Sequence, residues 1–451
     1  MKQCLILGII MLNMMQQGLG QVIPTDPLPS VLPQVTEPLK RTTEQLQQRA
    51  LQQQLSEKLA EKANLADPLT ILPQTLEVLS NTGQLRWREV EVEQGFRAIE
   101  REWLLLVSVG EWQQLVSDWP VLPSMVQSED KLASLGLSLI KIKVPVELDS
   151  ASALQTKLTA QLAIFAGRNH LYQPQVSMMS ELGASTINTA PMCQWPVTLG
   201  MIDTAIALDH PALQQQTGHL TILQRNFLPE DVAQSLAHGT AIAGVLAGQH
   251  QVAPLLPQLN LFSASAFYPS NLYQQSATLS HIILALDWLA GQEVKIINMS
   301  LTGPDNPVLA AIVQQLALKQ IILVAAAGNG GPAASPLFPA AYNDVLAVTA
   351  VDEQLQLYRW ANQGDYIDFA AHGVKVAALR ADGEVALQSG TSIATPVVTA
   401  AAACLRAQQP ELTLAELRLA LIAQARDLGK QGKDQQFGYG LITSPLKFEL
   451  E

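Results

Sequence analysis

Apolar runs mark out a regular series of elements in the C-terminal part of the chain. Between residues 196 and 446, the continuous apolar runs VTLGMI, KIINMSL, IILVAAAG and DVLAVTAV alternate with helix-like runs such as HIILALDWLAG and LAELRLALIAQA. A strand that is buried on both faces loses the alternation of apolar and polar positions, and a helix between two such strands allows them to run parallel. The pattern predicts an α/β domain over residues 196–446, with a parallel sheet covered by helices on both faces.

A smaller α+β domain is predicted over residues 82–164. The run WLLLVSV at 103–109 indicates a strand, and residues 111–119 indicate a short helix. A half-buried strand is indicated where apolar residues alternate with lysines, at Ile140, Ile142 and Val144. A helix is indicated after Ser150, where leucines recur at helical spacing, at Leu154, Leu158 and Leu162. The domain has no motif with a chemistry of its own, which favours a role in binding or chaperoning.

The segments that precede this domain have a different character. Residues 1–20 combine Lys2, an apolar run and the small residues Gly18 and Gly20, the pattern of a secretory signal peptide cleaved after Gly20. The run is too short to span a bilayer and no later segment is a better candidate, so we expect a soluble, secreted or periplasmic protein without a membrane span. Residues 21–81 are rich in Pro, Gln and Leu, with one exposed helix at 36–65 that suits a solvated spacer or, alternatively, a partner-binding helix.

Composition and charge exclude one class of partner. The chain has 451 residues, of which 48% are hydrophobic and 15% charged, as in globular proteins. The net charge of -12 excludes nucleic acid as a partner, because neutralising phosphates requires clustered Lys and Arg.

Two cysteines, Cys193 and Cys404, remain after removal of the signal peptide, and an exported compartment would let them pair. Because Cys404 falls inside an alanine-rich apolar helix, we expect a packed free thiol, with a disulfide as the alternative.

Four polar residues fall where predicted strands end or helices begin. Asp203 follows the run VTLGMI, Asn329 follows IILVAAAG, His238 begins an apolar helix, and Ser392 stands in GTSIATP before an alanine-rich helix. Functional residues of parallel sheets gather at the carboxyl ends of the strands, and backbone N–H groups at a helix start favour developing negative charge. Taken singly, each residue could be a helix cap, a core histidine or a turn. Together they form a candidate site for nucleophilic catalysis, with an orienting carboxylate, a base, an amide donor and a hydroxyl.

An extended segment accompanies these residues. After the run KIINM, the residues Ser300, Leu301, Thr302 and Gly303 could form a strand that pairs with the backbone of a peptide.

These segments resemble the catalytic domain of the subtilisin family of serine peptidases. The resemblance is carried, in the family's order, by MIDTAIALDHP, AHGTAIAGVLAG, INMSLTGP, AAAGNGGP, SPLFPAAYNDVLAVTAVD, DFAAHGVKV and GTSIATPVVTAAAA. Two positions depart from the family pattern. Ala205 replaces the usual Gly or Ser and stays small, whereas Thr302 stands where many members have Gly and reshapes the cleft.

The resemblance implies a serine endopeptidase that acts through an acyl-enzyme. It assigns Asp203, His238 and Ser392 to the catalytic triad, and Asn329, with the backbone N–H of Ser392, to the oxyanion hole. The cleft would be lined by small uncharged residues, which favours an apolar side chain in the first specificity pocket. The implied substrate-binding residues are Ser300, Leu301, Thr302, Gly303, Ala326, Ala327, Gly328 and Thr391.

The resemblance also implies a zymogen that acts on polypeptide substrates. Residues 82–164 would be the propeptide and intramolecular inhibitor, and the polar, turn-rich residues 165–195 an exposed, mobile linker that the enzyme itself cuts between 165 and 194. No cofactor is expected. Family members often bind calcium, but no run of alternating Asp and Asn marks a calcium site here, which leaves calcium unassigned. The alternative from another class is a binding or assembly protein that uses the N-terminal helix, with the peptidase fold as a scaffold.

Overall fold

The C-terminal part of the chain is built on a seven-stranded parallel sheet. The computed structural model describes residues 75–158, 165–174, 177–181, 190–214, 219–249, 254–271 and 274–447. The strand order of the sheet is β17-β16-β15-β13-β8-β10-β9. The strands are β8 (Val197–Asp203), β9 (Thr221–Asn226), β10 (Leu259–Ser265), β13 (Ile296–Met299), β15 (Ile322–Ala326), β16 (Val345–Val351) and β17 (Phe369–His372). The four continuous apolar runs are β8, β13, β15 and β16 in the middle of this sheet, so the predicted parallel sheet is confirmed.

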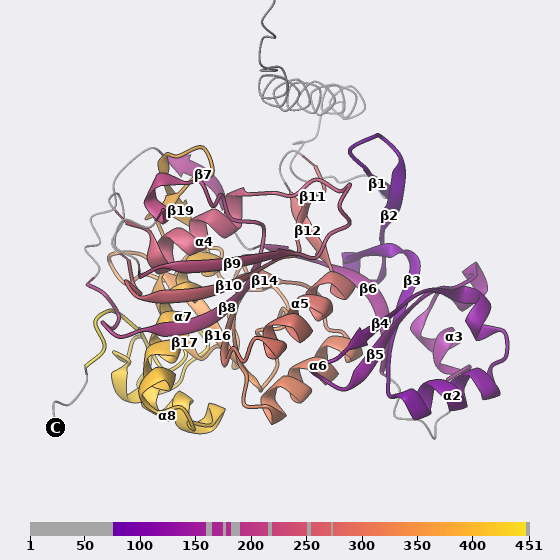
Figure 1. The fold of residues 1–451 in the computed structure, drawn as a ribbon. Coiled ribbons are helices and arrows are strands. Elements are labelled where there is room, and N and C mark those ends of the chain that lie inside the picture. The colour runs from indigo at the N-terminus through magenta and orange to yellow at the C-terminus, as the bar shows by residue number, and fades with distance from the viewer. Residues whose placement is uncertain are drawn as a thin grey trace, which may run out of the picture. The chain divides into compact units, whose positions relative to one another are not determined.

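Helices supply two separate apolar layers against this sheet. One apolar cluster includes residues of α4 (Ala237–Ala247), α7 (Thr391–Gln408) and α8 (Leu414–Gln424), and a second includes residues of α5 (Leu279–Gly291) and α6 (Pro307–Leu318). Alternate side chains of the central strands divide between the two clusters, as Ile296 and Ile297 do in β13. Helices therefore lie on both faces of the sheet, as predicted, with α4, α7 and α8 on one face and α5 and α6 on the other (Figure 1).

Side chains cap several of these helices and fix where they begin. Thr278 caps α5, Asn306 caps α6, and Thr413 forms a capping box with Glu416 at α8. Helix α7 differs, because its N-cap is Gly390 without a side-chain cap. The hydroxyl of Ser392, the second residue of α7, is therefore not a helix cap of the ordinary kind.

The two cysteines form a disulfide, which corrects the expectation of a free thiol. Cys193, in the segment before β8, pairs with Cys404 of α7 across a sequence separation of 211 residues. Both residues belong to the same apolar cluster, and Trp195 Nε1 donates to the carbonyl of Cys404. Burial of Cys404 in a helix does not prevent pairing, because another buried segment presents Cys193 to the same helix.

The N-terminal part of the described chain is an antiparallel sheet with two helices. Its strands β3 (Arg97–Val107), β4 (Val126–Leu132), β5 (Leu137–Lys143) and β6 (Phe165–Pro174) lie in the order β4-β5-β3-β6. The helices are α2 (Val109–Asp118) and α3 (Ala151–Gln155). The strands, α2 and the start of a helix after Ser150 appear where the sequence indicated them. Helix α3 ends at Gln155, before Leu158, and Leu162 lies outside the described residues.

The borders of this small domain differ from those predicted. A hairpin of β1 (Thr75–Leu79) and β2 (Leu85–Glu91) joins its sheet, so strand pairing begins before residue 82. Strand β6 begins at residue 165, where an exposed linker was expected, and Arg168, Asn169 and Tyr172 are buried in it. The polar sequence gave no strand signal because β6 is stabilised by long-range pairing on both sides.

Two predictions lie outside the described residues. They are the signal peptide at 1–20 and the exposed helix at 36–65. Within the described ranges, no helix has the length and apolar character needed to cross a membrane.

Candidate active site

Asp203 and His238 meet at the carboxyl end of β8. Oδ1 of Asp203, the last residue of β8, lies 2.6 Å from Nδ1 of His238 in the first turn of α4. Both residues are buried, and Asp203 Oδ1 also accepts from the backbone N–H of Thr204 at 2.7 Å. The other ring nitrogen, Nε2, is buried and has no hydrogen-bond partner among the described residues. A carboxylate that accepts from Nδ1–H leaves Nε2 with a lone pair that can take a proton.

Gly239 allows this contact. Its backbone N–H donates to Oγ1 of Thr204 at 2.7 Å, and a Cβ at this position would lie 2.2 Å from the carbonyl oxygen of Thr204. Only a glycine lets the start of α4 approach the end of β8 so closely. The small residues that follow His238 in the sequence are thus explained by close packing.

Ser392 is held by a buried polar network that the sequence analysis missed. Ser300 Oγ donates to the carbonyl of Ser392 at 2.9 Å and accepts from Nδ2 of Asn298 at 3.0 Å. Oδ1 of Asn298 accepts in turn from Oγ1 of Thr399 at 2.9 Å, and Thr399 lies further along the same helix α7 as Ser392. All four residues are fully buried. The available signal was polar residues, Asn298 and Thr399, inside runs that are otherwise apolar.

Asn329 is joined to the residue before Ser392. Its Oδ1 accepts from the backbone N–H and from Oγ1 of Thr391, each at 3.1 Å, and Thr391 Oγ1 also accepts from the N–H of Gly328. These bonds use the oxygen of the amide, which turns its nitrogen away from Thr391. The end of β15 at Ala326 and the loop that follows it, with Ala327 and Gly328, are thereby held against the start of α7.

The sheet brings these pairs to one edge. Strand β13 lies between β8 and β15 and is parallel to both, so their carboxyl ends face the same side. Asp203 ends β8, Ser300 follows β13, and Asn329 follows β15. The structure therefore joins Asp203 with His238, Asn329 with Thr391, and Ser300 with Ser392. The side chain of Ser300 donates to the backbone carbonyl of Ser392, and the prediction that Ser300 binds substrate stays a prediction.

Leu301 and Thr302 form the short strand β14 (Leu301–Thr302), which pairs with the chain's own β6. The antiparallel register sets Leu301 opposite Pro174 and Thr302 opposite Gln173. On its other edge, β6 pairs with β12 (Gln275–Thr278), with Ala277 opposite Tyr172. The segment predicted to pair with a peptide backbone is thus paired with residues of the N-terminal domain.

Tyr172 anchors β6 in this position. The side chain is fully buried, and its hydroxyl donates to the carbonyl of Pro304 at 2.9 Å. A Cβ at Gly303 would lie 2.4 Å from the ring, so the absence of a side chain at Gly303 provides the space that Tyr172 occupies. Burial raises the pKa of Tyr172 well above its usual range, which keeps the hydroxyl neutral.

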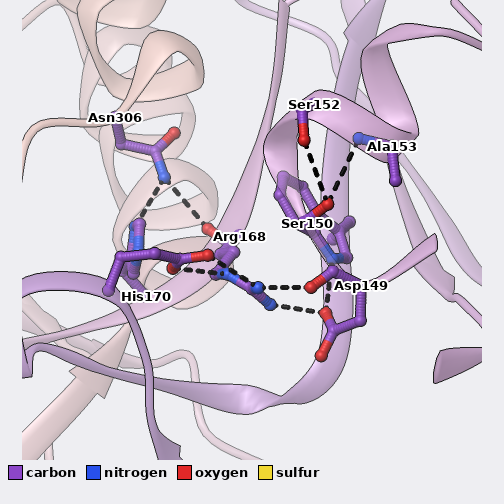
Figure 2. A network of polar contacts seen from close by, with 9 residues as sticks. Asp149, Ser150, Ser152, Ala153, Arg168, His170 and Asn306 are labelled. Carbon is purple, nitrogen blue, oxygen red and sulfur yellow. Dashed lines mark hydrogen bonds and ion pairs between the residues drawn. The ribbon is translucent and has the colours of Figure 1, made fainter. Parts of the chain in front are cut away.

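Polar contacts of Arg168 and His170, which precede Tyr172 in β6, also hold this strand in place. Figure 2 shows Arg168 beside Asp149, and His170 beside Asn306. The Arg168 guanidinium donates to Glu93 at 2.9 Å and to Asp149, and the Arg168 carbonyl accepts from Nδ2 of Asn306 at 3.0 Å. Asn306 belongs to the C-terminal part, where its Oδ1 caps α6. This asparagine therefore connects the two parts of the chain.

From Ser177 onwards, the chain pairs with the strand that precedes Ser392. Strand β7 (Ser177–Glu181) is antiparallel to β19 (Val385–Ser389), with Ser177 opposite Ser389. Ser389 is three positions before Ser392. Strand pairing therefore flanks the short stretch between Pro174 and Ser177 on both sides, through β14 next to Ser300 and through β19 next to Ser392.

Comparisons with known proteins match the part of the chain that carries these residues. A family model described as the subtilase family matches residues 196–440. The minor extracellular protease Epr of Bacillus subtilis (strain 168) is 32% identical over 250 residues, which are 54% of this chain and 37% of that protein. Subtilisin DY of Bacillus licheniformis is 30% identical over 254 residues, 55% of this chain and 89% of that protein. Subtilisin E of Bacillus subtilis is 29% identical over 275 residues, 59% of this chain and 69% of that protein. The chain therefore spans well under half of the length of the first of these relatives and most of the second.

Proposed function

Since the chain belongs to the subtilase family of serine peptidases, we propose that it is an exported endopeptidase made as a zymogen, with residues 75–174 as its inhibitory prosegment. The match to the family lies within 196–440, so the prosegment is outside it. The proposal for the prosegment is supported by the pairing of β6 with β12 and β14.

The proposed mechanism assigns one step to each polar residue of the site. Asp203 holds the Nδ1–H tautomer of His238 and stabilises its charged form, and His238 Nε2 takes the proton of the Ser392 hydroxyl as Oγ attacks the peptide carbonyl. The imidazolium then protonates the leaving amine, and water releases the acyl group by the reverse sequence. Asn329 and the backbone N–H of Ser392 stabilise the oxyanion. In subtilisin itself, loss of such an asparagine lowers turnover about 100- to 1000-fold.

One observation supports the zymogen most directly. Residues on both sides of the stretch between Pro174 and Ser177 pair antiparallel with strands that adjoin Ser300 and Ser392, as an extended peptide substrate would. We therefore propose that self-cleavage occurs between Pro174 and Ser177. This is a narrower position than the range 165–194 expected from the sequence.

The prosegment also covers apolar surface of the catalytic part. Leu104, Leu106 and Leu139 belong to the same apolar cluster as the core residues of α5 and α6. The carboxylate of Asp287 in α5 accepts from the backbone N–H groups of Ser134 and Leu135 at 2.9 and 3.1 Å. Separation of the prosegment would expose this surface to water, which favours the inhibited state after the cut.

Self-cleavage is tested by Ser392→Ala. The variant loses Oγ without a change in core volume, so the folded chain should stay intact while the wild type appears as two fragments. Ser335→Ala, at an exposed serine, is the matched control and should be cut like the wild type. Purified proteins would be compared on a gel and by intact mass. If Ser392→Ala is cut at the same bond in the absence of other proteases, the proposed self-cleavage is wrong.

Labelling separates the enzyme from the alternative of a binding or assembly protein. A fluorophosphonate should attach to Ser392 of wild-type protein from which the cut prosegment has been released or degraded, and not to Ser392→Ala. Folded catalytic part that is free of the prosegment and takes up no label would favour the alternative, in which the peptidase fold is a scaffold.

A further inference from the structure

The β1–β2 hairpin contacts the catalytic part at a place separate from β6. Strand β2 pairs with the first residues of β3, with Glu89 opposite Ile99, and so extends the prosegment sheet. Its partners in the catalytic part lie in residues 228–232 after β9 and at β11 (Tyr268–Pro269) and Ser270. We call this contact the hairpin anchor. It comprises Val78, Asn81, Arg86, Trp87 and Glu89 of the hairpin and Leu228, Asp231, Val232, Tyr268 and Ser270 of the catalytic part.

The centre of the hairpin anchor is apolar and aromatic. The rings of Trp87 and Tyr268 meet edge-on with centroids 5.1 Å apart, and Trp87 Nε1 donates to the Tyr268 hydroxyl at 3.3 Å. Val78, Leu228 and Val232 are buried around this pair. Aromatic anchors in desolvated contacts contribute most of the affinity at interfaces.

A buried carboxylate joins the two sides of the hairpin anchor. Glu89 is 1% exposed, and its Oε1 accepts from the hydroxyls of Tyr268 at 2.8 Å and Ser270 at 3.2 Å. Its other oxygen lies 3.6 Å from Nε of Arg97. Burial raises the pKa of Glu89, and the hydrogen bond from Tyr268 opposes that shift. Departure of the hairpin would therefore cost this carboxylate two of its hydrogen bonds.

The tip of the hairpin makes the third kind of contact. Arg86 forms an ion pair with Asp231, and the backbone N–H of Asn81 donates to the Asp231 carbonyl at 2.7 Å. Neighbouring Arg88 pairs instead with Glu77 of the same hairpin. The two arginines thus differ in whether their partner belongs to the catalytic part.

We propose that the hairpin anchor keeps the prosegment attached to the catalytic part after self-cleavage, as an attachment that does not depend on the cleft. This inference rests on the proposed function, because it presumes a cut zymogen. In the catalytic part the hairpin anchor uses residues 228–232, β11 and Ser270, whereas β6 pairs with β12 and β14. Strand β11 is the next strand beyond β12 in the sheet, so it does not itself pair with β6. A substrate that displaces β6 from the cleft therefore leaves the hairpin anchor in place.

The hairpin anchor adds to the contact with α5 and α6 and to β6 in the cleft, so the folded prosegment acts as a multivalent inhibitor. While the hairpin anchor holds, β6 stays at a high local concentration and returns to the cleft before the prosegment diffuses away. The product of the cut is then a latent two-chain complex, and lasting activity follows removal or degradation of the prosegment.

The test measures prosegment dissociation without relying on self-cleavage. The full chain would carry Ser392→Ala and a recognition sequence for an unrelated protease in place of residues 183–188, so that this protease makes the cut. After dilution, the retained prosegment is followed by size-exclusion chromatography and intact mass. The variants are Trp87→Ala, Arg86→Ala and Asp231→Ala, with Arg88→Ala as the matched control.

Trp87→Ala should raise the dissociation rate at least about tenfold. Arg86→Ala and Asp231→Ala should each raise it by a smaller, non-additive amount, because they remove the same pair. Arg88→Ala should behave like the unsubstituted chain. If the cut prosegment is retained equally in Trp87→Ala, Arg86→Ala and the control, the proposal is overturned. If Trp87→Ala does not fold, the comparison of a folded Arg86→Ala protein with the control still decides the question. Self-cleavage is scored separately in chains that keep Ser392, so its failure would be recognised by itself.

Discussion

The side-chain amide nitrogen of Asn306 lies 2.9 Å from Nδ1 of His170, across the boundary between the catalytic part and the prosegment. The orientation of this amide is fixed, because its oxygen accepts from the N–H of Val308 and its nitrogen also donates to the Arg168 carbonyl. Nδ1 of His170 must therefore accept, which requires that it carry no proton. A proton on Nδ1 would face an N–H donor (Figure 2).

This contact predicts that acid weakens prosegment binding. Burial and then the charge of Arg168 lower the pKa of His170 to about 4, against the opposing charges of Glu93 and Asp305. In the separated prosegment the pKa returns towards about 6.5. Because the docked state has the lower pKa, its full stability is present above about pH 6.5 and is lost as the pH falls towards 4.

The acid effect should approach about tenfold in affinity per pH unit in that window for one histidine. Buried His281 in α5, with a pKa lowered to about 3 by burial and by Lys141, acts in the same direction if separation exposes it. His170→Gln keeps an acceptor for Asn306 but cannot ionise, so retention of its cut prosegment should depend less steeply on pH. Exposed His219→Gln is the control. Identical pH profiles for His170→Gln and wild type would rule out His170 as a contributor.

Gly239→Ala should reduce turnover strongly while the fold persists. The added Cβ would lie 2.2 Å from the Thr204 carbonyl oxygen, which forces α4 and His238 away from Asp203. A displacement of about 1 Å in a catalytic group costs on the order of 100-fold. The measurement is kcat/KM on a fluorogenic peptide, together with circular dichroism. Ser335→Ala, at an exposed serine of the catalytic part, is the control, and equal losses in the two variants would contradict this account.

Thr399→Val should destabilise the catalytic part through the buried network that holds Ser392. The variant removes the hydroxyl that donates to Asn298 at 2.9 Å and leaves a buried acceptor without that bond. The expected loss is about 1–3 kcal/mol in the free energy of unfolding, measured by denaturant titration of the Ser392→Ala chain. Thr198→Val, on the exposed side of β8, should change stability by less than about 0.5 kcal/mol. A Thr399→Val protein as stable as this control would show that the network does not support Ser392.

The sequence predicted the elements of the fold well where apolar runs are local. Strands β8, β13, β15 and β16 are continuous apolar runs, and their order with the helices indicated a parallel sheet. Asp203 and His238 stand at a strand end and a helix start, and the resemblance to the family assigned them to one site; in the structure they lie close together. Such features depend on a few neighbouring residues, so a single sequence contains them.

Features that depend on distant pairing could not be predicted in this way. Strand β6 has a polar sequence and gains its stability from β3, β12 and β14. The disulfide of Cys193 and Cys404, and the bond from Thr399 to Asn298, join segments far apart in the chain. In each case the residue types fit an ordinary local role, and only the tertiary structure brings their partners together.

Arg418 leads to the last prediction, which concerns cations. Its guanidinium donates to the carbonyls of Asn343 and Val345 and lies 3.3 Å from the buried carboxylate of Asp368. Carbonyl and carboxylate oxygens of this kind attract cations, and here a side chain of the protein itself supplies the positive charge. Lys433 also approaches Asp368, at 3.4 Å. No group of three or more His, Cys, Asp or Glu residues in the described ranges could hold a metal ion.

We therefore predict that Arg418→Ala destabilises the protein and that a chelator does not. Removing the guanidinium leaves buried acceptors with fewer partners, at a cost of about 1–3 kcal/mol in the free energy of unfolding. Arg380→Ala, which removes an exposed pair with Asp382, is the matched control and should cost little. Thermal unfolding of the Ser392→Ala chain would be recorded for each variant with and without EDTA. A melting temperature of the unsubstituted chain that falls with EDTA would show a structural metal ion, and would require its ligands to be sought elsewhere in the chain.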